Sequence, residues 1–296
     1  MRQYTKEKIK ELIPGWVLDY RRIYYANKKY KKGTKRRNLL KFEFHLANHC
    51  NLNCNSCTHF SPLVKEKYLD INIFERDCQR IAELSNGYLE VIRFMGGEPL
   101  LHKNIIDFLN IGRTHFPKTA LDIVTNGIIL PKQTSEFWET CRKNNIQVHI
   151  SNYPLQIKRE EINILARKHK VKVIYLNNKT GLHWNNMKLD VNGGQNPQES
   201  FKLCSQSNFC INLYEGKIYT CPTIAYIKYL NDYFNENFIV SNEDYIDIYK
   251  VKSIDEILDF LCKPMPFCKY CNIKKQDKIK WDVSKKERKE WIDERC

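Results

Sequence analysis

The chain has 296 residues, of which 42% are hydrophobic, so it is long and apolar enough for a globular fold and is not a disordered protein. Its formal net charge is +15, but residues 1–41 hold 14 Lys and Arg against 3 Asp and Glu, which leaves 35 against 31 for the rest. The basic character therefore belongs to an N-terminal arm, and the body of the protein is not a basic nucleic-acid-binding domain.

Residues 1–40 are predicted to form this basic arm. Residues 5–30 have the pattern of one or two helices interrupted at Pro14-Gly15, and a basic run follows at 28–37. A basic segment with aromatic and aliphatic side chains can lie on an anionic membrane surface or contact nucleic acid. It can equally be solvated or pack on the main domain. We rank nucleic acid behind the other two interpretations.

Strand and helix patterns alternate regularly from residue 41 onwards. Phe42, Phe44 and Leu46 alternate with polar residues, which is the periodicity of a strand. Further strands are predicted at 89–95, 120–124, 146–150 and 171–176, and helices at 72–84, 104–116, 135–143 and 160–169. This alternation favours an α/β fold over residues 41–190, with a parallel sheet and crossover helices that form a barrel or an open part of one.

The pattern changes after residue 190. A connection at 192–197 precedes a predicted hairpin with strands at 211–214 and 217–219 around Glu215-Gly216. We expect residues 191–275 to form a small α+β domain rich in cysteine. Residues 276–296 are predicted to form a charged tail that is helical in part.

The chain contains twelve cysteines, more than a cytosolic protein of this length usually carries without a metal or redox role. Residues 1–10 are charged, and no apolar run of signal-peptide type follows them. No stretch approaches the roughly 20 apolar residues that cross a bilayer. We therefore expect a cytoplasmic protein whose thiols are available as metal ligands, with contact to the inner membrane surface only through its arm.

Three of these cysteines lie in one short loop after the first predicted strand. Cys50, Cys54 and Cys57 have the spacing C-x3-C-x2-C, at the sheet edge where active sites of parallel α/β folds assemble. A 4Fe–4S cluster is usually held by four cysteines, so three would leave one iron open to another ligand. Three cysteines could also form part of a zinc site with His49 or His59.

The order of motifs resembles the radical S-adenosylmethionine (SAM) family, whose signature is C-x3-C-x2-C after a first strand. Gly96-Gly97-Glu98-Pro99 follows the second predicted strand, as the GGEP motif of the family does. Thr125-Asn126-Gly127 ends the third strand, as in many members. The resemblance implies a partial (β/α)6 barrel and a 4Fe–4S cluster on the three cysteines, with SAM bound at the open iron.

The resemblance also implies residues that bind SAM. Gly96, Gly97 and Glu98 would hold the ammonium group of its methionine part, because glycines allow close backbone approach and a carboxylate pairs with a cation. Asn126 ends the third strand and would also contact the cofactor. Ser151 ends the fourth strand and is assigned by position alone.

One position departs from the family pattern. The residue before the third cysteine is commonly aromatic in the family, whereas here it is Ser56. His59 or Phe60, just after the third cysteine, is expected to supply the ring instead. The departure bears on the contact with adenine and not on cluster binding.

A second group of cysteines comprises Cys204, Cys210, Cys221, Cys268 and Cys271. Their order around the predicted hairpin resembles the twitch domain, a shortened SPASM-like domain that holds one auxiliary cluster on four cysteines. The resemblance implies a second 4Fe–4S cluster on Cys221, Cys268, Cys271 and one of the other two, with Cys204 slightly favoured over Cys210. A structural zinc site would suit the same spacing.

Two functions are compatible with these features. The first is a radical SAM enzyme that cleaves SAM reductively and removes a hydrogen atom from its substrate, leading to oxidation, epimerisation or elimination. We expect a sugar, nucleotide sugar or other small metabolite as substrate, ahead of a peptide, and a reductant such as flavodoxin or ferredoxin. The alternative is a zinc-binding nucleic-acid-binding protein. That alternative leaves the GGEP and TNG motifs without a role, so we favour the enzyme.

Overall fold

The computed structural model describes Val17, Leu39 and residues 41–176, 183–186, 188–275 and 277–294. The predicted basic arm therefore lies outside the described residues apart from Val17 and Leu39, and its contacts with a membrane or nucleic acid stay predictions. Among the described residues, no helix is long and apolar enough to cross a lipid bilayer.

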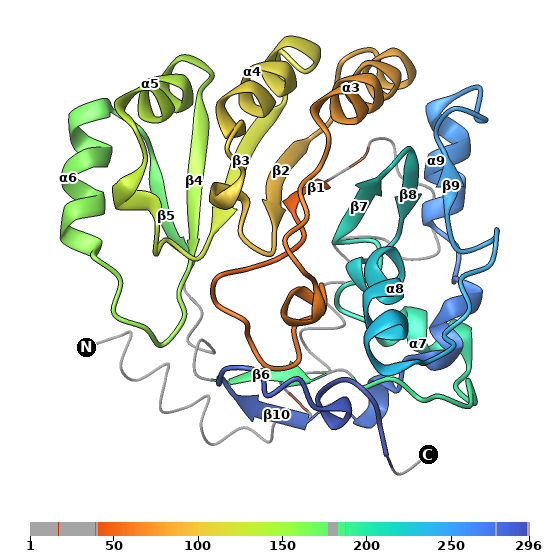
Figure 1. Ribbon diagram of the computed structural model, residues 1–296. Helices are drawn as coiled ribbons and strands as arrows, with labels where there is room; N and C mark the ends of the chain where they lie inside the picture. The colour runs from red at the N-terminus through yellow and green to blue at the C-terminus, as the bar shows by residue number, and fades with distance from the viewer. Residues whose placement is uncertain are drawn as a thin grey trace.

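An eight-stranded sheet forms the centre of the protein, in the order β5-β4-β3-β2-β1-β7-β8-β9 (Figure 1). Its strands are β1 (Phe42–Ala47), β2 (Val91–Gly96), β3 (Ala120–Thr125), β4 (Ile146–Ser151), β5 (Val173–Leu176), β7 (Ile211–Tyr214), β8 (Lys217–Tyr219) and β9 (Ile246–Asp247). The strands from β1 to β5 are parallel, and β7 is parallel to β1. The sheet is open, which confirms the predicted α/β fold that forms only part of a barrel.

The strand β7 joins this sheet on the side of β1 that faces away from β2. Phe42 of β1 is paired with Ile211 of β7, and Phe44 with Leu213. The predicted hairpin therefore extends the sheet of the first half of the chain. The domain bounds at 41–190 and 191–275 remain predictions.

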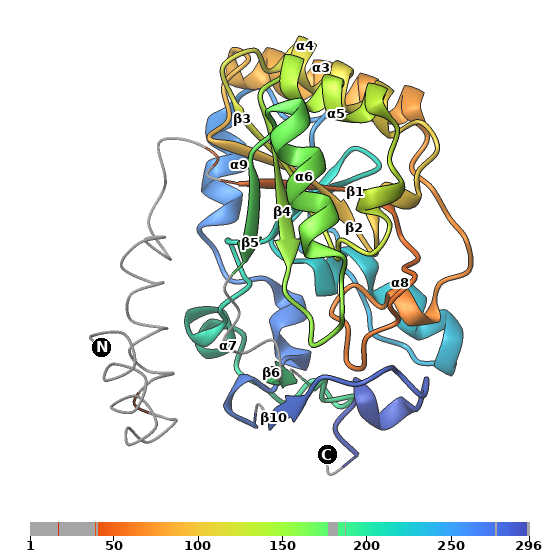
Figure 2. The same cartoon turned by 90° about the vertical axis from the view of Figure 1, so that its left-hand side faces the viewer.

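Four helices cover one face of the sheet: α3 (Ile71–Ser85), α4 (Ile105–His115), α5 (Ser135–Lys143) and α6 (Arg159–His169) (Figure 2). The side chain of Asp70 caps α3 by accepting hydrogen bonds from the backbone N–H groups of Asn72 and Ile73. Gly112 lets α4 approach β2 closely, because a Cβ at this position would lie 2.6 Å from the ring of Phe94. These contacts place the helices over the apolar face of the strands.

The opposite face of the sheet is polar but buried. Glu43, Arg93 and Asp122 are aligned in register across β1, β2 and β3. Arg93 Nε lies 3.8 Å from Asp122 Oδ2, and burial raises the pKa of Glu43. All six residues of β1 are buried because the C-terminal half of the chain covers this face as well, where the Tyr226 ring stacks on that of His45 at 4.1 Å. The predicted alternation of apolar and polar residues along β1 therefore separates two buried faces, and neither face of this strand is exposed to solvent.

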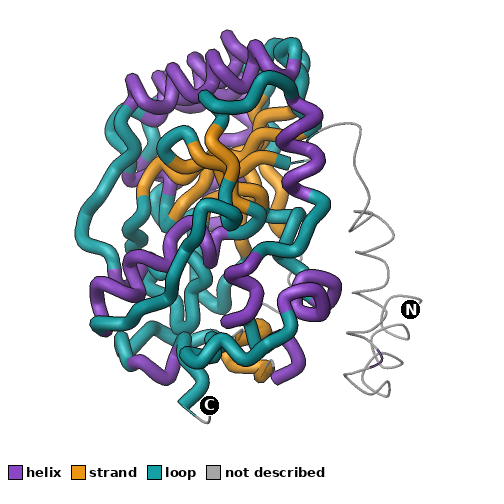
Figure 3. The backbone as a smooth tube through the Cα atoms, turned by 90° about the vertical axis from the view of Figure 1, so that its right-hand side faces the viewer, coloured by secondary structure: helices purple, strands orange, loops and turns teal. Residues whose placement is uncertain are grey.

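The C-terminal half contains α7 (Pro197–Leu203), α8 (Pro222–Phe234), α9 (Ile254–Leu261) and a two-stranded antiparallel sheet of β6 (His183–Asn186) and β10 (Asp277–Lys280). Short 3-10 helices occur at Ser61–Leu63, Pro99–Leu101, Leu130–Lys132, Pro266–Tyr270, Ile273–Lys275 and Arg288–Glu290. A second apolar cluster, which includes Phe60, Phe201, Tyr226, Phe267 and Trp291, forms the core of this half. Figure 3 shows helices on one side of the strands and a loop-rich part carrying the C-terminus on the other.

The last described residues of the chain are part of the fold. Residues 276–296 were expected to form a charged tail that is helical in part, and the described part contains β10 and one short 3-10 helix. The backbone N–H of Leu189 donates to the carbonyl of Trp291, and that of Asp293 donates to the carbonyl of Leu189, both at 2.8 Å. These bonds hold the end of the chain against the connection that follows β6.

Candidate functional site

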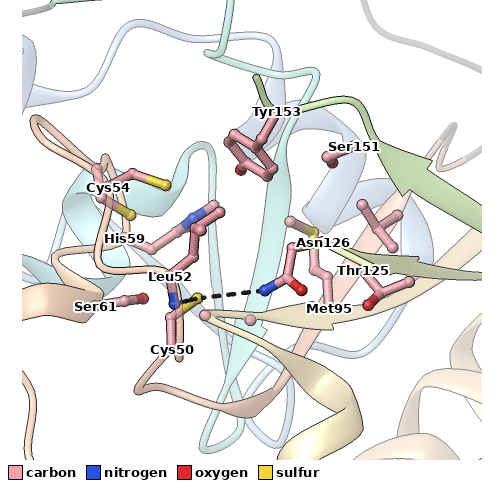
Figure 4. A pocket seen from close by; sticks show the side chains of 14 residues that line it. Cys50, Leu52, Cys54, His59, Ser61, Met95, Thr125, Asn126, Ser151 and Tyr153 are labelled. Atoms are coloured by element: carbon pink, nitrogen blue, oxygen red, sulfur yellow. Dashed lines mark hydrogen bonds between the residues drawn. The ribbon is translucent and has the colours of Figure 1, made fainter. Parts of the chain in front are cut away.

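A pocket lies at the edge of the sheet where the parallel strands β1 to β4 end (Figure 4). Its walls come from the loop after β1 and from the ends of β2, β3 and β4. The lining residues are Cys50, Leu52, Cys54, Cys57, His59, Ser61, Met95, Gly96, Gly97, Val124, Thr125, Asn126, Ser151 and Tyr153. The structure therefore brings together all residues predicted for the first site, with the exception of Glu98.

The cysteine loop reaches this arrangement through two residues in the left-handed region of backbone conformation. Asn53 has a φ of 50° and Ser56 a φ of 55°. Left-handed residues reverse the chain direction locally, and Asn tolerates them better than most residues. The backbone N–H of Leu52 donates to Cys50 Sγ at 3.4 Å. The loop is thus folded so that its thiols line one pocket.

The three thiols line the same pocket, with Cys54 buried and Cys50 and Cys57 partly buried. Burial, together with the neighbouring cysteines, raises the pKa of Cys50 and of Cys54 to about 12 in each case. Burial also raises the pKa of Cys57, against the effect of nearby N–H groups of His59 and Ser61. Without a positive centre these groups stay protonated, whereas bound metal stabilises thiolates. The donor set therefore fits a cationic metal centre.

The described donors of the cysteine loop also bear on the alternative of a zinc site. Within the part of the chain that the structure describes, no three His, Cys, Asp or Glu side chains are placed to share one metal ion. Zinc needs its sulfur ligands about 2.3 Å from one point, whereas ligands of a cluster bind different irons. His49, one candidate zinc ligand, uses Nδ1 to accept a 3.1 Å hydrogen bond from the backbone N–H of Lys67.

The two glycines after β2 are required by the cysteine loop itself. A Cβ on Gly96 would lie 2.2 Å from the carbonyl oxygen of Ala47, and one on Gly97 would lie 2.2 Å from that of His49. The backbone N–H of Gly97 donates to the Ala47 carbonyl at 2.8 Å, and that of Glu98 donates to the His49 carbonyl at 3.1 Å. The end of β2 is therefore packed directly against the start of the cysteine loop.

The side chain of Glu98 lies behind the pocket wall. It is fully buried, and its carboxylate accepts hydrogen bonds from Thr125 Oγ1 at 2.7 Å, from the Asn126 N–H at 2.9 Å and from the Leu100 N–H at 3.1 Å. Burial raises its pKa to about 7, against the effect of these donors. Its predicted contact with the ammonium group of a cofactor remains a prediction, and the contacts present connect β2 to the loop after β3.

Asn126 and Ser151 both line the pocket, at the ends of β3 and β4. Asn126 Nδ2 donates to Asn51 Oδ1 at 2.7 Å and lies 3.9 Å from Cys50 Sγ (dashed line in Figure 4). The backbone N–H of Ile128 donates to Asn126 Oδ1 at 3.0 Å. The amide of Asn126 is therefore fixed on both sides and holds the first cysteine in place, while the hydroxyl of Ser151 faces the pocket.

Of the two rings expected near the third cysteine, His59 lines the pocket and Phe60 does not, and a contact with adenine stays a prediction. Burial lowers the pKa of His59 to about 4, so the ring is neutral at pH 7. Phe60 lies instead in the second apolar cluster, with its ring 6.4 Å from that of Trp291.

Two aromatic residues near the site were missed by the sequence analysis. Tyr153 lines the pocket two residues after the end of β4, a position that the strand pattern could have indicated. Trp281 Nε1 donates to Cys54 Sγ at 3.2 Å. Nothing local in the sequence indicates that contact, because the two residues are 227 positions apart.

The second cysteine group is also brought together. Cys204, Cys221, Cys268 and Cys271 are all buried in the second apolar cluster. The pKa of Cys271 is raised by burial and then by the other three. Cys210 is not a member of that cluster: after burial, Glu43 raises its pKa and Lys41 lowers it, each with more effect than Cys204. This placement favours Cys204 over Cys210 as the fourth member of the group.

Comparisons with known proteins give a partial sequence match and a match in fold. The chain matches no protein-family model. It is 33% identical over 84 residues to a GTP 3′,8-cyclase of Chlorobaculum tepidum, which covers 28% of this chain and 24% of that protein. It is 34% identical over 92 residues to a GTP 3′,8-cyclase of Geobacter sulfurreducens, which covers 31% of this chain and 28% of that protein. The match thus spans less than a third of either relative.

Among solved structures, the chain is similar to BtrN in complex with AdoMet and 2-DOIA. The TM-score is 0.53 with 18% sequence identity, and the match covers 81% of this chain and 94% of BtrN. This similarity extends over both halves of the described fold and concerns the fold alone.

Proposed function

We propose that this chain, which is related in sequence to radical SAM enzymes and shares the fold of one of them, holds a 4Fe–4S cluster on Cys50, Cys54 and Cys57 and cleaves SAM reductively. The observation that carries the proposal is a set of three thiols from one loop that line a pocket at the carboxyl edge of a parallel sheet. The cluster held by these three cysteines would supply the one-electron reduction that cleaves SAM and so permits removal of a hydrogen atom from the substrate.

The chain's own residues would hold SAM beside the cysteine loop. The backbone of Gly96 and Gly97 forms one wall of the pocket, and Asn126 and Ser151 present an amide and a hydroxyl to it. Glu98 would keep Asn126 in position through the backbone N–H bond between them. We assign these residues to SAM binding because they are the polar groups of the pocket that the family motifs also indicate.

We also propose an auxiliary 4Fe–4S cluster on Cys204, Cys221, Cys268 and Cys271. The four thiols are buried together, and burial and the neighbouring cysteines raise the pKa of Cys221 and of Cys271, which is an arrangement that a cationic centre would stabilise. Cys210 is the alternative for Cys204, and its position beside Glu43 makes it the weaker candidate.

The substrate that best suits the polar face of the sheet is a small polar molecule such as a sugar, a nucleotide sugar or a similar metabolite. The polar face below the pocket carries Glu43, Arg93, Asp122 and His149. Arg93 Nε and His149 Nε2 lie 3.8 and 3.7 Å from the carboxylate of Asp122, so this face of the sheet is charged and suits a polar substrate better than an apolar one. Oxidation, epimerisation or elimination would follow hydrogen abstraction, and a peptide is the second substrate class.

Three further parts of the proposal concern the cellular context. The electron would come from a reductant such as flavodoxin or ferredoxin. A reducing cytoplasm would keep the cysteines available as ligands. The basic arm would make any contact with the inner membrane surface.

Metal analysis after anaerobic reconstitution tests the proposal against the zinc-binding alternative. We expect about eight irons per chain, four for each cluster. A chain with Cys50, Cys54 and Cys57 all changed to Ala should lose about half of them. Cys262→Ala is the matched control, because that thiol donates to the Asp259 carbonyl at 3.1 Å and belongs to neither group. Stoichiometric zinc without iron would overturn the proposal.

A further inference from the structure

The C-terminal segment, residues 281–291, lies directly on the cysteine loop. The backbone N–H of Asn55 donates to the carbonyl of Asp282 at 2.9 Å, and that of Ser284 donates to the carbonyl of Asn53 at 2.7 Å. Two backbone hydrogen bonds of this kind form a short antiparallel pairing. The segment therefore holds the middle of the loop, between the first and third cysteines.

A second pair of contacts fixes the end of the same loop. Ser56 Oγ donates to the carbonyl of Glu290 at 2.8 Å, and Trp291 Nε1 donates to the carbonyl of Cys57 at 2.9 Å. The buried carboxylate of Glu290 accepts a 2.7 Å hydrogen bond from Ser284 Oγ. The C-terminal segment is thus tied to itself and to the loop, which gives it a defined position.

One side chain of the segment reaches a cysteine sulfur. Val283 is paired with Cys54 in an isolated antiparallel bridge, and Trp281 Nε1 donates to Cys54 Sγ at 3.2 Å. The indole ring lies 6.2 Å from the ring of Tyr153, which lines the pocket. The sulfur of a predicted cluster ligand therefore accepts a hydrogen bond from a residue far away in the chain.

We infer that the C-terminal segment positions the cysteine loop and that Trp281 raises the reduction potential of the cluster through Cys54. This inference rests on the proposed cluster. Reduction adds negative charge to the irons and their sulfur ligands, and an N–H donor aimed at a sulfur stabilises that charge. Trp281 is a positioning residue in this scheme, because it acts through Cys54 and not on the substrate.

A redox titration of the reconstituted full-length protein, followed by electron paramagnetic resonance, tests the inference. The cluster on the cysteine loop is identified by the change in its spectrum when SAM is added. In Trp281→Phe we expect a lower midpoint potential. At the potential where half of the wild-type cluster is reduced, the ratio of reduced to oxidised cluster should be about fivefold lower, the size of one net hydrogen bond.

Trp291→Phe is the matched control. It removes an indole N–H from the same loop, but from the carbonyl oxygen of Cys57 instead of a sulfur. The inference predicts a clearly smaller change in potential for this variant. An equal change in both variants would mean that a loosened loop, and not the bond to sulfur, sets the potential, and would overturn the inference.

The result also separates this inference from the proposed function. A wild-type protein that takes up no cluster refutes the proposed function, whereas an unchanged potential in a fully loaded Trp281→Phe refutes only the inference. If Trp281→Phe takes up no cluster, Trp281→His, which keeps a ring N–H, decides. Loading with a potential close to that of the wild type supports the inference, and failure to load or a clearly lower potential overturns it.

Discussion

The carboxylate of Glu98 accepts a 2.9 Å hydrogen bond from the backbone N–H of Asn126, which joins the end of β2 to the loop after β3. Thr125 Oγ1 donates to the same carboxylate at 2.7 Å. The GGEP and TNG motifs are therefore one connected unit in the structure. Asn126 Nδ2 in turn donates to Asn51 Oδ1 of the cysteine loop at 2.7 Å. The ionisation of Glu98 therefore affects residues that hold the pocket together.

The first prediction concerns the pH dependence of stability. Burial raises the pKa of Glu98 from its ordinary value of 4.5 to about 7 in the folded protein. Between these values the folded state binds more protons than the unfolded state, so the stability contributed by the neutral group is lost as pH rises through this range. The metal-free wild type should lose up to about 3 kcal/mol relative to Glu98→Gln between pH 4.5 and pH 8.

Chemical denaturation of both metal-free proteins across this pH range measures the difference. Other titrating groups are common to the two proteins, so their contributions cancel in the comparison. Parallel stability profiles would show that Glu98 does not ionise with a raised pKa.

The second prediction concerns the contact between β2 and the cysteine loop. In Gly97→Ala the new Cβ would lie 2.2 Å from the His49 carbonyl oxygen, which forces the loop to move. We expect a loss of about 3 kcal/mol in stability and reduced iron uptake. In Gly194→Ala the nearest atom is Asp190 Oδ2 at 3.4 Å, an ordinary contact, so this control should keep its stability. Denaturation curves and iron content of the two variants test the difference, and equal effects would count against the close approach.

The third prediction concerns SAM binding. Ser151→Ala removes a hydroxyl that faces the pocket and should weaken SAM binding by up to about tenfold, with iron content unchanged. Asn152→Ala is the matched control, because the neighbouring side chain contacts Arg159 and does not line the pocket. Anaerobic calorimetry on the loaded proteins measures both affinities. Equal affinities in both variants would remove Ser151 from the SAM site.

The fourth prediction separates the two candidates for the auxiliary cluster. Cys204→Ser should reduce the iron content from about eight to about four per chain, whereas Cys210→Ser should retain nearly all of it. The physical reason is the location of Cys204 with Cys221, Cys268 and Cys271 in one buried cluster. Iron analysis of the two variants decides, and the reverse pattern would assign Cys210 as the ligand.

Local patterns in the sequence predict the first half of the fold well. The strands and helices from Phe42 to Leu176 follow apolar periodicity, and the structure places them within a few residues of the predicted ranges. The cysteine loop and the two glycines were found because their spacing is local. Each of these features depends on residues close together in the chain, which is what a sequence pattern records.

Contacts between distant parts of the chain could not be predicted in this way. No local sequence pattern indicates that β7 pairs with β1 or that Trp281 approaches Cys54. The contact of Glu98 with the ammonium group of SAM stays a prediction, and what the motif does not show is that Thr125 and Asn126 donate hydrogen bonds to its side chain. The direction of a side chain at a strand end depends on its neighbours in the next strand, which the motif alone does not show.

The central claim is that the cluster on Cys50, Cys54 and Cys57 cleaves SAM, and the most direct measurement is the amount of 5′-deoxyadenosine formed by the anaerobically reconstituted, reduced protein. The wild type and Cys262→Ala should form it, and the chain with all three cysteines changed to Ala should form none. Formation by the triple variant at the wild-type rate, or its absence from iron-loaded wild type under strong reductant, would contradict the claim.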